Sequence, residues 1–419
     1  MIVLIKAAKV VDPNSKHHNE VVDILIEKGI IMDIGKNLKT PKDADIIEEN
    51  GLHVSPGLFD LHANFRDPGF EWKEDIETGM LAAAKGGFTG VLIMPSTLPV
   101  TDTKSQIEYI QKMSTDNVVN VHPAGSITKD LKGQELTEMF DMSRSGALAF
   151  TDDKNSIQHA GVMKLALLYT KNFDGIIMNQ ANDKSISRDG QMNEGITSTV
   201  LGLKGIPALA EELMIARDIK IAEYTEGKLH FSCISTAKSV ELIRSAKKKE
   251  LNITADVAIH NIVLDETACT GFDTNYKVNP ALRTQKDITA LIKGLKDGTI
   301  DAICTDHSPE DIEHKKVEFD NAKFGMIGLQ TAFSLACQLE KEFGLEEIIK
   351  KMAINPRKIL GLEAPEINIK KTANLVLFNP NSEWTLEEKD IVSKSKNTPF
   401  IGKKLKGKII AVINNGKLC

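Results

Sequence analysis

The sequence predicts an α/β fold: a (β/α)8 TIM-type barrel with a small β-sandwich domain formed from the N- and C-terminal segments. Two observations support this fold. In the middle of the 419-residue chain, short apolar runs alternate with amphipathic segments of helical periodicity. Both ends of the chain carry strand and hairpin patterns instead. We therefore expect the barrel at residues 55–364 and a composite β domain built from residues 1–54 and 365–419.

The terminal segments are similar to each other in pattern. Residues 21–37 consist of apolar runs on either side of a Lys-Gly turn. Residues 372–380 and 406–419 show the same pattern, with Asn415-Gly416 as the turn. Asn-Gly between apolar runs is a strong hairpin signal. The two ends are expected to pair into one β domain that closes the chain on itself.

Eight apolar runs lie between these ends, and helical patterns follow most of them. Repeated strand–helix units imply a parallel sheet, and eight of them suggest a closed barrel. In such barrels, chemistry takes place at the carboxyl ends of the strands. The expected strands lie at 57–63, 88–95, 117–124, 146–152, 175–181, 228–234, 252–259 and 301–306.

The helical segments between these runs have recognisable starts and stops. Residues 74–87 are expected to place four apolar side chains on one stripe and to end at Gly86-Gly87. A long helix is expected from Pro207 in its first turn to Gly227. Similar helices are expected within 236–249 and 284–298. The apolar stripe expected within residues 74–87 consists of Ile76, Met80, Leu81 and Ala84.

Composition excludes several classes of function. Lys and Arg total 52 against 58 Asp and Glu, so the net charge of −6 provides no basic field for nucleic acid or for an anionic membrane. No apolar stretch approaches the roughly 18 residues of a membrane span, and the apolar N-terminus lacks the features of a signal peptide. The five cysteines are odd in number and show no CxxC spacing. They argue against a disulfide framework or a structural zinc module and favour a reducing cytoplasm.

Polar side chains cluster where the expected strands end. His, Asp and Cys side chains from different strands that converge on one barrel mouth are typical of a metal-assisted hydrolase. Each residue also has a simpler interpretation, such as His62 packing in the mouth or Cys233 as a small buried filler. The strand-end residues are Asp60, His62, Asn64, Ser96, Asp152, Asp153, Gln180, Cys233, His260, Asp306 and His307.

Several motifs resemble those of dihydroorotases in the amidohydrolase superfamily. The segment SPGLFDLHANFRDPGFEWKEDIETG at 55–79 is similar to the family's first-strand motif, and MPSTLP at 94–99 to its second. The segments TDD at 151–153, KVNPALRT at 277–284, DAICTDHSPE at 301–310 and KFGMIGLQT at 323–331 follow in the family's order. The resemblance spans almost the whole chain. It implies hydrolysis of the cyclic amide of dihydroorotate, or ring closure of carbamoyl-aspartate, at a zinc pair.

The resemblance also implies roles for single residues. His62, Asp153 and Asp306 match metal ligands, and Asp306 is also the expected catalytic acid and base. Arg66 and Asn279 match residues that contact the substrate. Other positions depart from the family's pattern: Asn64, Gln180 and Cys233 stand where it has histidines, Ser96 where it has Asn, Glu310 where it has His, and Asn261 replaces one His of a pair.

These departures weaken the expected metal centre. Zinc prefers imidazole, thiolate or carboxylate ligands, whereas the amide oxygens of Asn64 and Gln180 are neutral. We expect at most one zinc ion, or none, in a reduced site. A carboxylated Lys154, as in hydantoinase-like relatives, is a less favoured alternative because the Asp152-Asp153 pair already accounts for that position. The ligands of the reduced site would be His62, Asp153, Cys233 and Asp306.

The sequence therefore favours a cytoplasmic, oligomeric protein of pyrimidine biosynthesis that is non-catalytic or weakly active, a pseudoenzyme. By family resemblance, its expected partner is aspartate carbamoyltransferase, which it would support structurally. One alternative is an active dihydroorotase, or another cyclic-amide hydrolase, with a single-metal site. Another is a metal-free scaffold protein outside pyrimidine metabolism.

Overall fold

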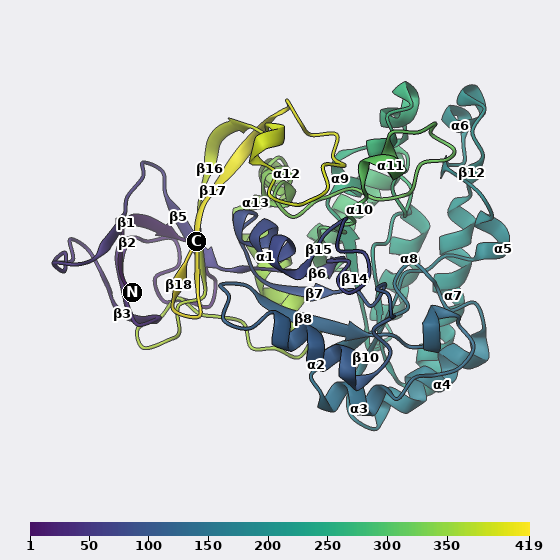
Figure 1. Ribbon diagram of the computed structural model, residues 1–419, viewed down its shortest axis with the longest axis horizontal. Coiled ribbons are helices and arrows are strands. Elements are labelled where there is room, and N and C mark those ends of the chain that lie inside the picture. The colour runs from purple at the N-terminus through teal and green to yellow at the C-terminus, as the bar shows by residue number, and fades with distance from the viewer.

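The two ends of the chain pair with each other in the computed structural model, which describes residues 1–419. Strand β16 (Leu375–Thr385) runs antiparallel to β5 (His53–Pro56), with Val376 opposite Ser55. Figure 1 shows the yellow C-terminal strands beside the purple N-terminal ones. The composite β domain is thus confirmed as one mixed sheet of eight strands. Its other strands are β1 (Ile2–Val10), β2 (Val21–Glu27), β3 (Ile30–Gly35), β4 (Asp45–Ile47), β17 (Lys404–Asn414) and β18 (Lys417–Leu418).

The eight predicted barrel strands are all present, and neighbouring strands run parallel. They form one sheet in the order β15-β14-β13-β10-β9-β8-β7-β6, which confirms the TIM-type barrel. The strands are β6 (Leu58–Ala63), β7 (Phe88–Ile93), β8 (Asn120–Gly125), β9 (Ala149–Phe150), β10 (Ile176–Asn179), β13 (Lys228–Phe231), β14 (Ile253–Ala258) and β15 (Ala302–Cys304).

The barrel closes between its first and last strands. A parallel bridge joins Ala63 to His307, and the Asn64 N–H donates to the His307 carbonyl at 2.8 Å. Below it, the Asp60 carboxylate accepts the Thr305 N–H at 2.8 Å and the Thr305 hydroxyl at 2.5 Å. Burial raises the pKa of Asp60 to about 7. Asp60, which the sequence placed among the mouth residues, therefore joins the two edge strands of the barrel.

Helices surround the barrel at the predicted places. Helix α1 ends with Gly86 as its C-cap, as expected, but Leu81 is 41% exposed, so the predicted apolar stripe is wrong at this residue. Pro207 is the residue before α7 and not its first turn. The main helices are α1 (Ile76–Lys85), α2 (Lys104–Met113), α3 (Met139–Arg144), α4 (Ala160–Lys171), α7 (Ala208–Thr225), α8 (Ala237–Lys247), α10 (Gln285–Lys296), α12 (Ala332–Cys337) and α13 (Glu340–Ile349).

Shorter elements decorate the loops. A two-stranded sheet and helix α6 lie in the long connection between β10 and α7. No helix combines the length and apolar character needed to cross a membrane. The short elements are α5 (Lys184–Ser187), β11 (Met192–Asn193), α6 (Ile196–Leu201), β12 (Gly205–Ile206), α9 (His260–Val263), α11 (Ile312–Lys315) and α14 (Asn355–Ile359).

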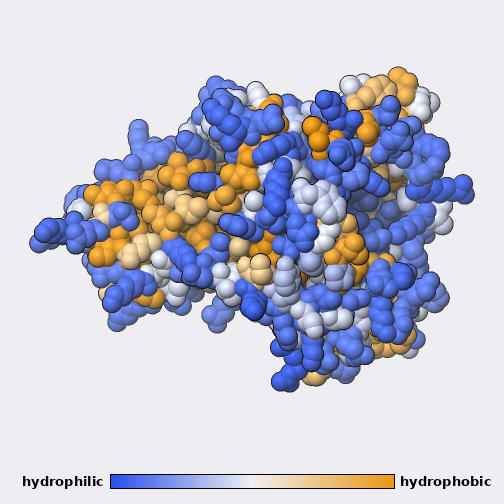
Figure 2. All heavy atoms as spheres, viewed as in Figure 1, coloured by the Kyte–Doolittle hydropathy of each residue, from blue (hydrophilic) through white to orange (hydrophobic).

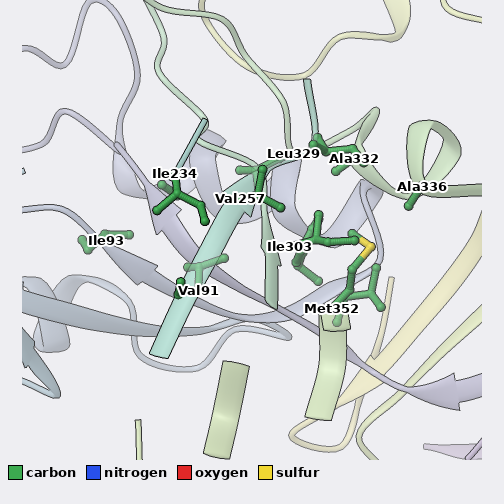
Figure 3. Packing of buried hydrophobic residues seen from close by; sticks show 14 of the residues in the cluster. Val91, Ile93, Ile234, Val257, Ile303, Leu329, Ala332, Ala336 and Met352 are labelled. Carbon is green, nitrogen blue, oxygen red and sulfur yellow. The ribbon is translucent and has the colours of Figure 1, made fainter. Parts of the chain in front are cut away.

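Apolar side chains form separate layers inside and outside the barrel. Phe59, Leu61 and Met178 belong to the inner cluster. A much larger cluster fills the space between the strands and the helices. Figure 3 shows part of it, with Ile303 beside Met352 and Val257 near Leu329. The β domain has a core of its own, and Figure 2 shows apolar side chains gathered over that domain.

At the amino-terminal end of the barrel, a buried arginine and a partly buried histidine pack on one phenylalanine ring. Arg357 is 4% exposed and lies over the ring of Phe59 at 5.1 Å, and His122 stacks on the same residue at 5.6 Å. Burial, with a smaller effect from the nearby Arg357 charge, lowers the pKa of His122 to about 4. His122 is therefore neutral in the folded protein over most of the acidic range.

This pKa predicts a pH dependence of stability. Between pH 6.5 and 4, the unfolded state binds a proton at His122 that the folded state does not, so the free energy of unfolding decreases as the pH falls. We expect H122Q to reduce this loss by about 2 kcal/mol between pH 7 and pH 5. Chemical denaturation at the two pH values measures it, with H17Q in the β domain as the control. Parallel pH dependences of wild type and H122Q would contradict the prediction.

Candidate functional site

Four predicted site residues occupy an unusual backbone conformation. Arg66, Asp153, Cys233 and Asp306 follow different barrel strands and have φ angles between 47° and 62°. This left-handed region is uncommon for residues other than glycine, and such residues cluster at functional sites. The turns that carry these four side chains therefore share one backbone conformation.

Two buried carboxylates lie together at the mouth. His62 donates from Nε2 to Asp153 Oδ1 at 2.9 Å and lies 3.6 Å from Asp306 Oδ1. Ser96 donates its hydroxyl to the second oxygen of Asp153 at 2.6 Å. His62 and both aspartates are at most 3% exposed. The structure thus brings together three predicted metal ligands. His62 lies between the two carboxylates and contacts both of them.

Lys154 supplies a further cation to this pair. Its ammonium group donates to Asp306 Oδ1 at 2.6 Å and to the Asn279 carbonyl at 2.7 Å. The contact with Asp306 raises the pKa of Lys154 despite its desolvation, and His62 together with Lys154 lowers the pKa of Asp153. Asp153 is therefore ionised beside His62, and Asp306 lies in direct contact with the ammonium group of Lys154.

The other predicted positions surround this cluster. Asn64 and Gln180 are 2% and 3% exposed, and the side-chain oxygen of Gln180 has no hydrogen-bond partner. His260 Nε2 lies 3.9 Å from Asp306 Oδ2, and burial lowers the pKa of His260 to about 4. Asn279 contributes its backbone carbonyl through the contact with Lys154. Asp152 is structural, because its carboxylate accepts the Ile127 and Thr128 N–H groups.

A second charge cluster lies beside the mouth. Arg66 donates to Glu310 at 3.1 Å and to the Pro309 carbonyl at 3.2 Å. Lys73 donates to the other oxygen of Glu310 at 2.6 Å. Glu310 is 6% exposed. The arginine predicted to contact the substrate is therefore already paired with a carboxylate of the same chain.

Cys233 faces a second thiol that the sequence did not single out. Its Sγ lies 3.6 Å from Cys304 Sγ, and both residues are at most 1% exposed. The sequence did not identify Lys154 as the partner of Asp306 or Cys304 as the partner of Cys233. The members of these pairs are 152 and 71 positions apart along the chain, so they meet only when the barrel closes. The only feature of the sequence that could have pointed to Lys154 and Cys304 is their position, since each lies within two residues of a predicted ligand.

These residues do not fit a zinc pair. Asn64 and Gln180 offer neutral amides at two of the ligand positions, and Nε2 of His62 bonds to Asp153. One ion fits better, because ligand atoms of His62, Cys233 and Asp306 lie within 4.8 Å of one another. Lys154 would have to leave Asp306 to make room for it. As ligands, these residues remain predictions.

The chain matches the family model described as dihydro-orotase-like over residues 51–239. It is 44% identical over 420 residues to the dihydroorotase of Acetivibrio thermocellus, covering 99% of this chain and 98% of that protein. It is 46% identical over 411 residues to the dihydroorotase of Ruminiclostridium cellulolyticum, covering 97% and 96%. The identity to these relatives therefore extends over essentially the whole length of both chains.

Solved structures with the same fold include hydantoinases. The L-hydantoinase (dihydropyrimidinase) from Arthrobacter aurescens superimposes with a TM-score of 0.86 at 20% identity, covering 100% of this chain and 96% of that one. A dihydropyrimidinase from Brevibacillus agri gives a TM-score of 0.80 at 19% identity, covering 100% and 95%. At such low identity, these matches support the barrel and the β domain only.

The ion pair between Lys154 and Asp306 predicts a measurable contribution to stability. Replacing Lys154 with Met leaves the buried Asp306 carboxylate without its nearest cation, and a hydrogen bond to a charged group contributes about 1.5–3 kcal/mol. Because the Lys154 side chain is 26% exposed, we expect K154M to lower the free energy of unfolding by about 1–2 kcal/mol. Denaturant unfolding measures it, with K164M on the exposed face of α4 as the matched control. Equal stability of the two variants would contradict the prediction.

Proposed function

Because the chain belongs to the dihydroorotase family, we propose that it serves pyrimidine metabolism as a weakly active or non-catalytic member that supports aspartate carbamoyltransferase. The observation that carries this proposal is the ammonium group of Lys154 at 2.6 Å from Asp306. Asp306, the residue expected to exchange protons with the substrate, is therefore paired with a cation of the same chain. Asp153 is likewise paired with His62. Five free thiols agree with a cytoplasmic location.

Charge balance at the mouth supports this proposal. A divalent ion near Asp153 and Asp306 would compete with His62 and Lys154, which already compensate both carboxylates. An added ion would also lie close to the ammonium group, and like charges in a poorly solvated site repel strongly. Tight binding of two ions would therefore require Lys154 to turn away from the mouth.

The second charge cluster weakens recognition of an anionic substrate. Dihydroorotate and carbamoyl-aspartate carry carboxylates that would need a free cation. Arg66 and Lys73 both bind Glu310, so a substrate carboxylate would have to displace a carboxylate that is already held in place. We therefore expect weak binding of either compound.

A single-ion cyclic-amide hydrolase is the second candidate, and two observations favour it. Relatives with 44–46% identity over nearly the full length are named dihydroorotase, which supports this candidate more directly than the first. Ligand atoms of His62, Cys233 and Asp306 also lie within 4.8 Å of one another. In this candidate the ion would polarise the scissile carbonyl, and Asp306 would move the proton.

Turnover distinguishes the two candidates. We expect ring opening of dihydroorotate by the full-length protein, with zinc supplied, to be at least about 1,000-fold slower than by the Acetivibrio thermocellus dihydroorotase, since two ligand positions carry amides. The assay follows carbamoyl-aspartate formation for both proteins in parallel. Turnover within tenfold of that enzyme, abolished by a chelator, would contradict the proposal and establish the single-ion hydrolase.

The variant N64H/Q180H/K154A tests the cause of this loss. It restores two imidazoles and removes the competing ammonium group, so the metal content should rise toward two ions per chain. Turnover should still lag behind the relative, because Ser96 and Glu310 remain at the mouth. The matched control is N64H/Q180H with Lys154 retained. If the control takes up as much metal as the triple variant, Lys154 does not exclude the ion.

A protein partner needs an apolar surface, and helix α6 provides the most exposed one. Ile196 and Val200 lie one helical turn apart and are 84% and 78% exposed. Side chains of this size are rarely left so accessible in adjacent turns without a contact to cover them. We assign α6 to the interface with the carbamoyltransferase, which should bury at least about 1,000 Å².

Co-expression tests the partner. The chain should elute together with aspartate carbamoyltransferase of the same organism in size-exclusion chromatography, and I196S/V200S should weaken the complex at least tenfold because it removes the central apolar contacts. L165S/L168S on α4 is the matched control, since both leucines are exposed at 54% and 40% on another helix. Separate elution of the two wild-type proteins would contradict this part of the proposal.

A further inference from the structure

A second cluster of metal-ligating side chains shares Cys233 with the predicted mouth residues. Cys233 follows strand β13, Asp256 lies in β14, and Cys304 ends β15, so the three residues come from neighbouring strands. Their ligand atoms all lie within 4.8 Å of one another. Asp256 and Cys304 have no role in the proposed function.

We propose that Cys233, Cys304 and Asp256 form a binding site for one thiophilic metal ion of the zinc class. The Sγ atoms of the two cysteines are 3.6 Å apart, and Cys304 Sγ is 3.4 Å from Asp256 Oδ1. Two sulfur ligands at about 2.3 Å from one tetrahedral ion lie about 3.8 Å apart, and a sulfur and a carboxylate oxygen about 3.5 Å apart. The three side chains therefore already have nearly the spacing of a coordination shell.

Hydrogen bonds fix the orientation of the Asp256 carboxylate in this site. Asp256 Oδ1 accepts the Cys233 N–H at 2.6 Å, and Oδ2 accepts from His230 Nε2 at 2.9 Å. His230 in turn contacts the Thr254 hydroxyl at 2.8 Å. Ligating carboxylates are commonly oriented by such hydrogen bonds. His230 lowers the pKa of the buried Asp256, so this ligand is ionised before an ion arrives.

The charge balance of this site differs from that of the mouth. Burial raises the pKa of the Cys304 thiol, so the thiol remains protonated in the absence of an ion. Thiolate is the form of cysteine that binds a metal ion, so binding at this site releases protons from thiols. Lys154 holds Asp306 at the mouth and makes no hydrogen bond to these three side chains, while the cationic His62 lies within 4.8 Å of the Cys233 sulfur. Soft thiolates also favour zinc over magnesium or calcium.

Metal binding by the full-length, reduced and metal-free chain tests this inference, which does not depend on catalysis. The exposed Cys419 is first replaced by Ser so that it cannot bind the added ion. We expect one Zn²⁺ per chain by elemental analysis and native mass spectrometry, and a thiolate-to-metal absorption band when Co²⁺ is bound. C304S should weaken binding at least about 100-fold. C269S, which alters another buried thiol, should bind normally.

Two further variants separate this site from the mouth. D306N should retain the ion if the ligands are Cys233, Cys304 and Asp256, and should lose it if the ion sits at the mouth. C304A replaces the thiol with a small apolar group and gives the same readout if C304S does not fold. Full binding by the Cys304 variants, loss of the ion in D306N, or no ion taken up by the reduced wild type would each overturn the inference.

Discussion

Asp153 and Asp306 lie buried side by side at the carboxyl ends of two barrel strands, and a buried carboxylate is stable only beside a compensating charge or hydrogen-bond donors. Here the charge comes from His62 and Lys154, at 2.9 Å and 2.6 Å. The same solution recurs nearby, where Glu310 balances Arg66 and Lys73. His62 and Lys154 therefore supply the positive charge that a metal ion would otherwise bring. Glu310 supplies the negative charge that an anionic substrate would otherwise bring.

Much of the fold follows from local sequence patterns. The eight apolar runs and the terminal hairpin patterns report burial directly, because a parallel strand covered on both faces must be apolar along its length. The errors are local: Leu81 lies within the helix pattern but faces solvent, and Pro207 precedes its helix. Neither difference changes the order of the barrel strands, because Leu81 lies on a helix outside the barrel and Pro207 lies directly before one.

The site was predictable only in part. Strand ends and family motifs identified His62, Asp153, Asp306 and Cys233, which the structure brings together. The partners of these residues depend on how distant strands meet, so the pairing of Cys233 with Cys304 was not visible in the sequence. Lys154 was considered as a modified ligand, whereas its ammonium group forms an ion pair with Asp306.

Anomalous scattering at the zinc edge, from crystals of the protein grown with zinc, tests the central claim most directly. We expect a single peak between the sulfur atoms of Cys233 and Cys304, and no peak between Asp153 and Asp306, where Lys154 remains in contact with Asp306. Two peaks about 3.5–4 Å apart, bridged by Asp153, with the Lys154 side chain turned away, would contradict it.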